Sequence, residues 1–118
     1  MISSFRDLIV WQKSLLLVKE VYEYTSLYPA TELYGLTNQM RRAAVSIPSN
    51  IAEGYGRKST GEYKRFLQIS VGSLYELQTQ IEIGFLLTFL SESGHQKLAA
   101  KTVELDRMLF ALIRKLKP

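Results

Sequence analysis

Apolar residues recur at alternating spacings of three and four along most of the chain, the pattern of helices with one buried side. The first series spans residues 8–25, the second 36–51, the third 67–84 and the fourth 98–116. No segment alternates apolar and polar residues with a period of two, so no sheet is expected. The pattern therefore predicts an all-α fold of four helices.

Three of the four predicted helices carry a second apolar stripe beside the first. In the first helix the expected buried seam is Leu8, Trp11, Leu15, Val18, Tyr22 and Thr25, and the flanking stripe is Val10, Leu17, Val21 and Tyr24. A wide core stripe with ordinary exposed apolar residues is one explanation. Surplus apolar surface more often marks a contact with a partner, so we expect self-association.

Short polar segments separate the four series. The expected first-turn capping pairs are Thr31 with Glu32, Ser59 with Glu62, and Ser93 with Gln96. Glycines at 54 and 56 end the second helix, and the third is expected to run to about Leu90. Connections of a few residues turn each helix back beside its predecessor. Residues 1–118 are thus expected to form one domain, an antiparallel up-down-up-down four-helix bundle.

Pro48 interrupts the second helix in the middle. It has no backbone N–H for the carbonyl of Ala44, and its ring crowds that carbonyl, at a cost near 3 kcal/mol in a regular helix. The apolar series nevertheless keeps its phase from Ala44 through Ile51. We therefore predict one helix that is kinked at Pro48, in preference to two separate helices.

Asn50 follows on the side of this helix that faces the core, where an unpartnered amide costs a few kcal/mol. The expected polar cluster around it, drawn from the second and third helices, is Ser46, Asn50, Glu53, Ser73 and Glu76, with Ser70 as a further donor. Such a cluster fixes register and helix pairing in one interpretation. In the other it lines a catalytic pocket, for which no nearby histidine offers a base.

Several kinds of chemistry are absent from the sequence. The chain has no cysteine, and its single histidine, His95, falls in the turn before the last helix, where we expect it to be solvated. A carboxylate-bridged metal site needs Glu-x-x-His pairs, and no phosphate-binding or dinucleotide-binding glycine loop is present. We expect no metal, no cofactor and no enzymatic activity. Without a long apolar run, we also expect a cytoplasmic protein with no membrane segment.

Positive charge is concentrated in residues 38–65, which contain six basic and two acidic residues. The expected nucleic-acid-binding residues are Arg41, Arg42, Arg57, Lys58, Lys64, Arg65 and Tyr55. Cations neutralise phosphates, and a tyrosine ring stacks on an unpaired base. The alternative is a solvated helix surface with an aromatic side chain packed in a loop.

Three stretches of the sequence together resemble a known family. Residues 35–59 read GLTNQMRRAAVSIPSNIAEGYGRKS, with DLIVWQKS upstream and GSLYELQTQIEIG downstream. They resemble the small four-helix bundle proteins encoded in intervening sequences of bacterial 23S ribosomal RNA genes. They are also similar to the accessory variability determinant proteins of diversity-generating retroelements. The resemblance implies homopentamers that bind nucleic acid and have no established enzymatic activity, and it places basic positions of the family on Arg41, Arg42 and Arg57. The other three basic residues come from charge clustering alone.

Two functions follow from these features. The first is a homo-oligomeric bundle that binds nucleic acid, either structured RNA or a DNA/RNA intermediate, through phosphate contacts. The second is a protein-interaction scaffold in which the surplus apolar stripes dock a protein partner such as a reverse transcriptase. The sequence contains no base-reading motif that separates RNA from DNA.

Overall fold

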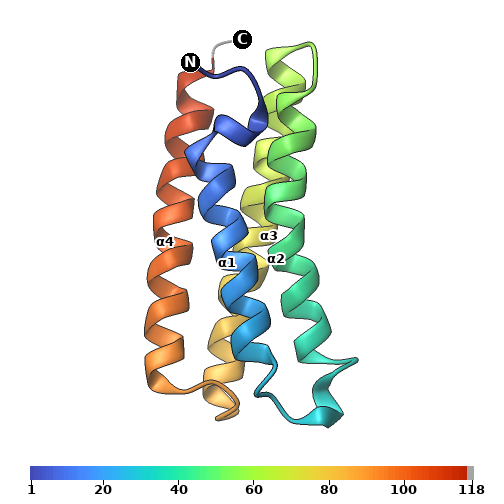
Figure 1. The fold of residues 1–118 in the computed structure, drawn as a ribbon, viewed down its shortest axis with the longest axis vertical. Coiled ribbons are helices and arrows are strands. Elements are labelled where there is room, and N and C mark those ends of the chain that lie inside the picture. The colour runs from blue at the N-terminus through green and yellow to red at the C-terminus, as the bar shows by residue number, and fades with distance from the viewer. Residues whose placement is uncertain (117–118) are drawn as a thin grey trace.

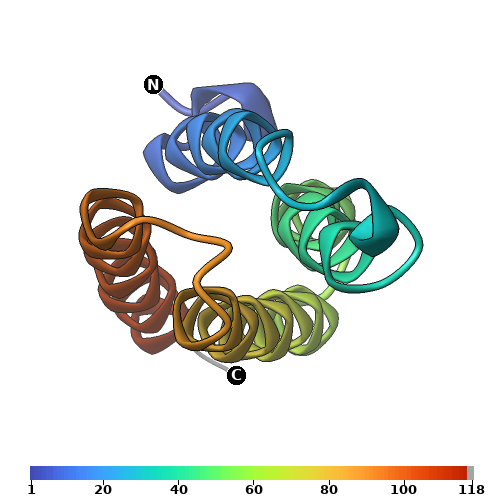
Figure 2. The same cartoon turned by 90° about the horizontal axis from the view of Figure 1, so that it is seen from below.

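The computed structural model describes residues 1–116, which form four long helices and two single-turn 3-10 helices (Figure 1). The elements are η1 (Phe5–Asp7), α1 (Ile9–Thr25), η2 (Ala30–Glu32), α2 (Leu36–Tyr55), α3 (Thr60–Leu86) and α4 (Glu92–Lys115). Successive long helices run in opposite directions, and seen from the end they surround one core (Figures 1 and 2). The predicted all-α four-helix bundle is confirmed, and residues 117 and 118 of the expected domain lie outside the described residues.

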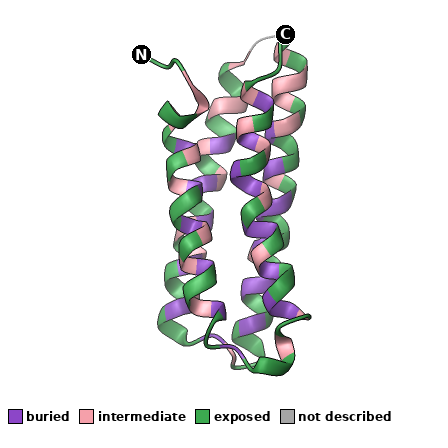
Figure 3. Cartoon of the chain, turned by 45° about the vertical axis from the view of Figure 1, so that its right-hand side comes forward, coloured by how far each residue is buried: buried purple, intermediate pink, exposed green. Residues whose placement is uncertain are grey.

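The core lies along the sides that the helices turn toward one another (Figure 3). The predicted apolar series of α2 (36–51) and of α3 (67–84) are buried throughout. In α4 the predicted series (98–116) is buried from Leu98 to Leu109. The predicted seam of α1 was wrong. Its buried residues are Val10, Ser14, Leu17, Val21 and Thr25, whereas Leu15 and Tyr22 are 42% and 43% exposed. Both stripes of α1 are apolar, so periodicity alone did not distinguish them.

The helix starts differ from the prediction at two places. Thr31 lies in η2, and α2 begins only at Leu36, whose N–H donates to the carboxylate of Glu32 (3.1 Å). The N-cap of α4 is Ser91 instead of Ser93, because α3 ends at Leu86 and Leu90 returns to the core. At Ser59 the prediction holds in part: its hydroxyl accepts from the N–H of Glu62 (3.1 Å).

Helix α2 continues unbroken through Pro48, which is buried. The preference for one helix over two is therefore confirmed, while the kink stays a prediction. Directly before the proline, the hydroxyl of Ser70 in α3 donates to the carbonyl of Ile47 (2.9 Å). A hydrogen bond from α3 thus lies beside Pro48, the residue that cannot donate a hydrogen bond within α2.

Three side chains of the predicted polar cluster meet between α2 and α3. The hydroxyls of Ser46 and Ser73 lie 2.8 Å apart, and the amide of Asn50 donates to the carbonyl and the hydroxyl of Ser46 (2.9 and 3.0 Å). These contacts join the two helices, which favours the structural interpretation. Glu53 does not take part: it is exposed and pairs with Arg57 (2.8 Å). Glu76 is exposed one turn along from Ser73.

Tyr28 packs its ring across the end of α3. The side chain is buried, its ring lies 5.6 Å from that of Phe89, and its hydroxyl has no hydrogen-bond partner among the described residues. Burial raises the pKa of Tyr28 to about 12. A Cβ atom at Gly84 would collide with this hydroxyl. Only glycine at position 84 therefore allows the ring to close this end of the core.

Replacing Gly84 with alanine is expected to lower the free energy of unfolding by about 1–3 kcal/mol, because the added methyl group overpacks the contact with Tyr28. Gly72→Ala is the matched control, since it makes the same change in the same helix where nothing lies within 4 Å. It should raise stability by up to about 1 kcal/mol through helix propensity. Urea unfolding measures both, and equal effects would contradict the assigned role of Gly84.

Ser46→Ala removes the hydroxyl that binds Ser73 and Asn50. Asn50 keeps its bond to the carbonyl of residue 46, but the Ser73 hydroxyl is left without its partner between the two helices. We expect this substitution to lower the free energy of unfolding by about 1–2 kcal/mol. Glu53→Gln should change it by less than about 0.5 kcal/mol, since exposed ion pairs contribute little. Denaturant titration of the two variants separates the cluster from its sequence neighbour; a larger loss for Glu53→Gln would show that the cluster was assigned incorrectly.

Candidate nucleic-acid interface

The six basic residues singled out in the sequence lie in two groups. Arg41 and Arg42 are in the first half of α2, whereas the other four lie around the turn that joins α2 to α3. Sixteen residues separate Arg41 from Arg57, which at 1.5 Å per residue is about 24 Å along the helix. The structure therefore does not gather all six into one patch.

At the α2–α3 turn, part of the charge is paired within the molecule. Arg57 binds Glu53 (2.8 Å) and Arg65 binds Glu62 (3.1 Å), and both guanidinium groups lie over the ring of Phe66. Lys58 is exposed and Lys64 is half-buried. Two of the four positive charges around the turn are therefore already paired within the molecule.

Tyr55, expected to stack on a base, is half-buried and packs edge-on against Tyr63, with ring centroids 6.0 Å apart. Burial raises the pKa of Tyr63. The pair joins the end of α2 to the start of α3. The two rings pack against each other at the edge of the core, and only part of the Tyr55 ring is open to solvent.

Arg41 is held in place by α1. Its Nε donates to the hydroxyl of Thr25 (3.0 Å), and its guanidinium lies 4.5 Å over the ring of Tyr22. The Thr25 hydroxyl in turn donates to the carbonyl of Val21 (2.7 Å). Because one edge of the guanidinium is fixed, its remaining N–H groups are oriented before any ligand arrives.

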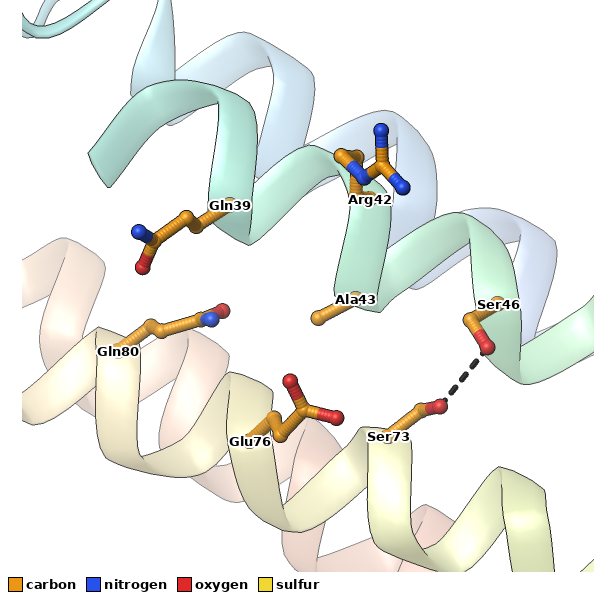
Figure 4. A pocket seen from close by; sticks show the side chains of 7 residues that line it. All are labelled: Gln39, Arg42, Ala43, Ser46, Ser73, Glu76 and Gln80. Carbon is orange, nitrogen blue, oxygen red and sulfur yellow. Dashed lines mark hydrogen bonds between the residues drawn. The ribbon is translucent and has the colours of Figure 1, made fainter. Parts of the chain in front are cut away.

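Two hollows adjoin on either side of Arg42. The first, here called the α1–α2 hollow, has a volume of about 490 Å³ and is lined by Tyr22, Asn38, Arg41, Arg42, Val45 and Ser46. The second, here called the α2–α3 groove, has about 280 Å³ and is lined by Gln39, Arg42, Ala43, Ser46, Ser73, Glu76 and Gln80 (Figure 4). Arg42 and Ser46 border both, so Arg42 stands on the ridge between them.

The two hollows differ in chemistry. The α1–α2 hollow contains two guanidinium groups and an amide with no acidic side chain in its lining, which suits a phosphate group. The α2–α3 groove contains the carboxylate of Glu76, which repels an anion. Sequence reasoning missed Asn38, Gln39 and Gln80 because they carry no charge. Their signal was spacing, since positions 38, 41 and 45, positions 39, 43 and 46, and positions 73, 76 and 80 each share one helix face.

The prediction that His95 is solvated in a turn was wrong. It belongs to the first turn of α4, its Nε2 lies 2.7 Å from the carboxylate of Glu82, and its ring stacks on Phe85 with centroids 4.3 Å apart. The side chain is only 21% exposed because these two residues of α3 cover it. The histidine therefore joins α4 to α3 at the end opposite the basic turn.

Residues 1–116 offer neither a metal site nor a membrane span. No three acidic or histidine side chains within that range come together in a way that could hold a metal ion. None of the helices there combines the length and the apolar character needed to cross a bilayer.

Residues 6–111 match the 23S rRNA-intervening sequence protein family. Among solved structures, the chain is similar to the crystal structure of a protein with unknown function from the S23 ribosomal protein family of Bacteroides thetaiotaomicron VPI-5482. The TM-score is 0.80 over 89% of this chain and 98% of that chain, and at 18% sequence identity the likeness shows the fold alone. No curated protein matches. Since the family match covers most of its length, the chain belongs to the 23S rRNA-intervening sequence protein family.

Proposed function

We propose that this protein is a non-enzymatic, homo-oligomeric, cytoplasmic bundle that binds nucleic acid, either RNA or a DNA/RNA intermediate, through its phosphates. The observation that carries the proposal is the α1–α2 hollow, where Arg41 and Arg42 line a concave surface with no acidic side chain. Membership of the 23S rRNA-intervening sequence protein family supports the same class of ligand, because the resemblance to that family implies nucleic-acid binding.

Arg41 provides the fixed contact in this proposal. Its bond to Thr25 and its packing on Tyr22 hold the guanidinium at the edge of the hollow, so little side-chain entropy is lost when a phosphate binds. Arg42 is exposed beside it and adds a second charge. Lys58 and Lys64 at the α2–α3 turn contribute longer-range attraction along the backbone of the nucleic acid.

Self-association is part of the proposal because large apolar side chains remain exposed on α1 and α4. Ile9 is 61% exposed, Leu16 is 56% exposed and Phe110 is 60% exposed. Burying such residues against further copies removes them from water. A homopentamer, the assembly implied by the family resemblance, would raise the net charge from +4 to +20 and let weak phosphate contacts act together.

The same exposed apolar residues support a second candidate, a scaffold that docks another protein such as a reverse transcriptase. In that case the basic residues steer the encounter and nucleic acid is not the ligand. Two results together would favour the scaffold. The protein would fail to bind polynucleotides, and a pulldown with it would retain one stable protein partner after nuclease treatment.

Arg42→Gln is expected to weaken binding of a single-stranded RNA by about tenfold, the scale of one lost charge-assisted hydrogen bond. The slope of log affinity against log salt should also fall by about 0.7 for each phosphate contact removed. Fluorescence anisotropy over a salt series measures both quantities.

Arg107→Gln is the matched control, because it removes the same charge from an exposed position of α4, away from both hollows. It should change the affinity by less than about twofold. Absent or salt-insensitive binding of the unchanged protein at about 50 mM salt would overturn the proposed function.

The assembly is tested by solution mass. The unchanged protein should have a mass several times that of the 13.5 kDa protomer, and the double variant Ile9→Glu, Phe110→Glu should move toward 13.5 kDa because two charges then face the partner copy. Tyr34→Ser, which changes an exposed side chain in the α1–α2 connection, is the control and should leave the mass unchanged. A stable monomer of the unchanged protein in dilute solution would contradict self-association.

A further inference from the structure

We infer that the α2–α3 groove binds a single unpaired guanine base of the nucleic acid whose phosphate lies against Arg42. This inference rests on the proposed function and adds a base preference to it. The groove is a second site beside the phosphate contacts, with its own set of polar groups.

The groove is built from matching faces of two antiparallel helices. Gln39, Ala43 and Ser46 of α2 face Gln80, Glu76 and Ser73 of α3, in that order along the groove (Figure 4). At one end the two serines are hydrogen-bonded and close the gap. In the middle the small side chain of Ala43 faces Glu76, so space remains. The groove is therefore shaped by a small residue between two polar pairs.

Gln80 carries the observation that points to a ligand. Its side chain is only 9% exposed, and its Oε1 is buried with no hydrogen-bond partner among the described residues. Buried polar atoms in folded proteins are nearly always paired, and an unpaired acceptor is costly. Figure 4 shows that the head of Gln80 extends along the groove toward Ala43 and Glu76. A hydrogen-bond donor placed in the groove would satisfy this atom.

The groove is rich in acceptors. The carboxylate of Glu76 offers two oxygens and Gln80 offers a third, while the amide of Gln39 supplies N–H donors at the same end. A free phosphate does not match, because Glu76 would repel it. The complementary ligand is neutral and has adjacent N–H groups together with one acceptor.

Guanine has that arrangement on its Watson–Crick edge. Its N1–H and N2–H₂ groups are adjacent donors that a carboxylate accepts in a bidentate manner, and its O6 is an acceptor for an amide N–H. Adenine and cytosine place one donor beside a ring acceptor, and uracil places one donor between two acceptors. Proteins read unpaired RNA bases along this edge. Guanine alone among the four therefore fits both Glu76 and Gln39.

The size and position of the groove agree with a single base. Its volume of about 280 Å³ lies just below the range of about 300–1,000 Å³ for pockets that enclose drug-sized ligands. Arg42 stands at the rim and its guanidinium is directed away from the groove floor (Figure 4). A phosphate held by Arg42 thus leaves its attached base free to enter between α2 and α3.

The experiment compares five oligoribonucleotides, each a nine-residue uridine strand whose central residue is U, A, C, G or inosine. Fluorescence anisotropy should show the G strand binding about tenfold tighter than the U strand, the scale of one bidentate base contact. Inosine lacks the N2 amine and should fall between G and U. Glu76→Gln should reduce the G preference to within about twofold, and Glu23→Gln, an equal charge change at an exposed position of α1, should retain it.

The outcomes separate this inference from the proposed function. Equal binding of all five strands, or a G preference that survives in Glu76→Gln, overturns the guanine site, while the loss of affinity in Arg42→Gln still supports phosphate binding. A preference for another base also overturns it. No binding of any strand removes the proposed function and the guanine site together. Because Glu76 is exposed, Glu76→Gln should keep the helical circular dichroism of the unchanged protein.

Discussion

The close approach of α2 and α3 is the constraint on which the rest of the structure depends. Small residues make it possible: Ser46 and Ser73 touch through their hydroxyls, and a Cβ atom at Gly54 would lie only 2.7 Å from the Cβ of Phe66. Helices that approach so closely leave no room for large side chains at their contact. Two of the polar side chains placed there, Ser70 and Asn50, find partners within the pair at backbone carbonyls, whereas the Oε1 of Gln80 has no partner among the described residues.

This approach also explains how a buried proline is tolerated in α2. Pro48 removes one hydrogen bond from the helix ladder, and in an isolated helix the chain would break there. The carbonyl of Ala44 loses its donor, but the carbonyl of Ile47 beside the proline accepts a bond from Ser70 of α3. Within α2, Asn50 also binds back to Ser46. Packing against α3 keeps Ile47 and Ile51 fully buried on either side of the proline. Tertiary contacts therefore hold a helix that local propensity alone would interrupt.

Much of this fold was predictable from sequence because α2, α3 and the first part of α4 place one continuous stripe of apolar residues inward. The prediction failed in α1, where two stripes are equally apolar and only packing against both neighbours selects Leu17 over Leu15. It also misplaced the start of α4, because Ser91 and Ser93 are both plausible caps and the return of Leu90 to the core decides between them. Local pattern identifies an element, whereas its orientation and its ends depend on neighbours.

The candidate site was predictable only in part, for a related reason. The family resemblance pointed to Arg41 and Arg42 but gave equal weight to Arg57, and charge clustering added Arg65. The charges of Arg57 and Arg65 are met by Glu53 and Glu62 one turn away. Charge clustering did not point to Gln39 and Gln80 of the α2–α3 groove, although Gln80 holds a buried acceptor without a partner among the described residues.

The two hollows share Arg42, but only the α2–α3 groove also contains a carboxylate, and that difference matters for the proposed function. Consider a strand whose phosphates follow the α1–α2 hollow. Glu76 repels its charged backbone from the α2–α3 groove but does not repel its neutral bases. The carboxylate on only one side of this arginine would therefore orient a bound strand, with its backbone toward α1 and its bases toward α3.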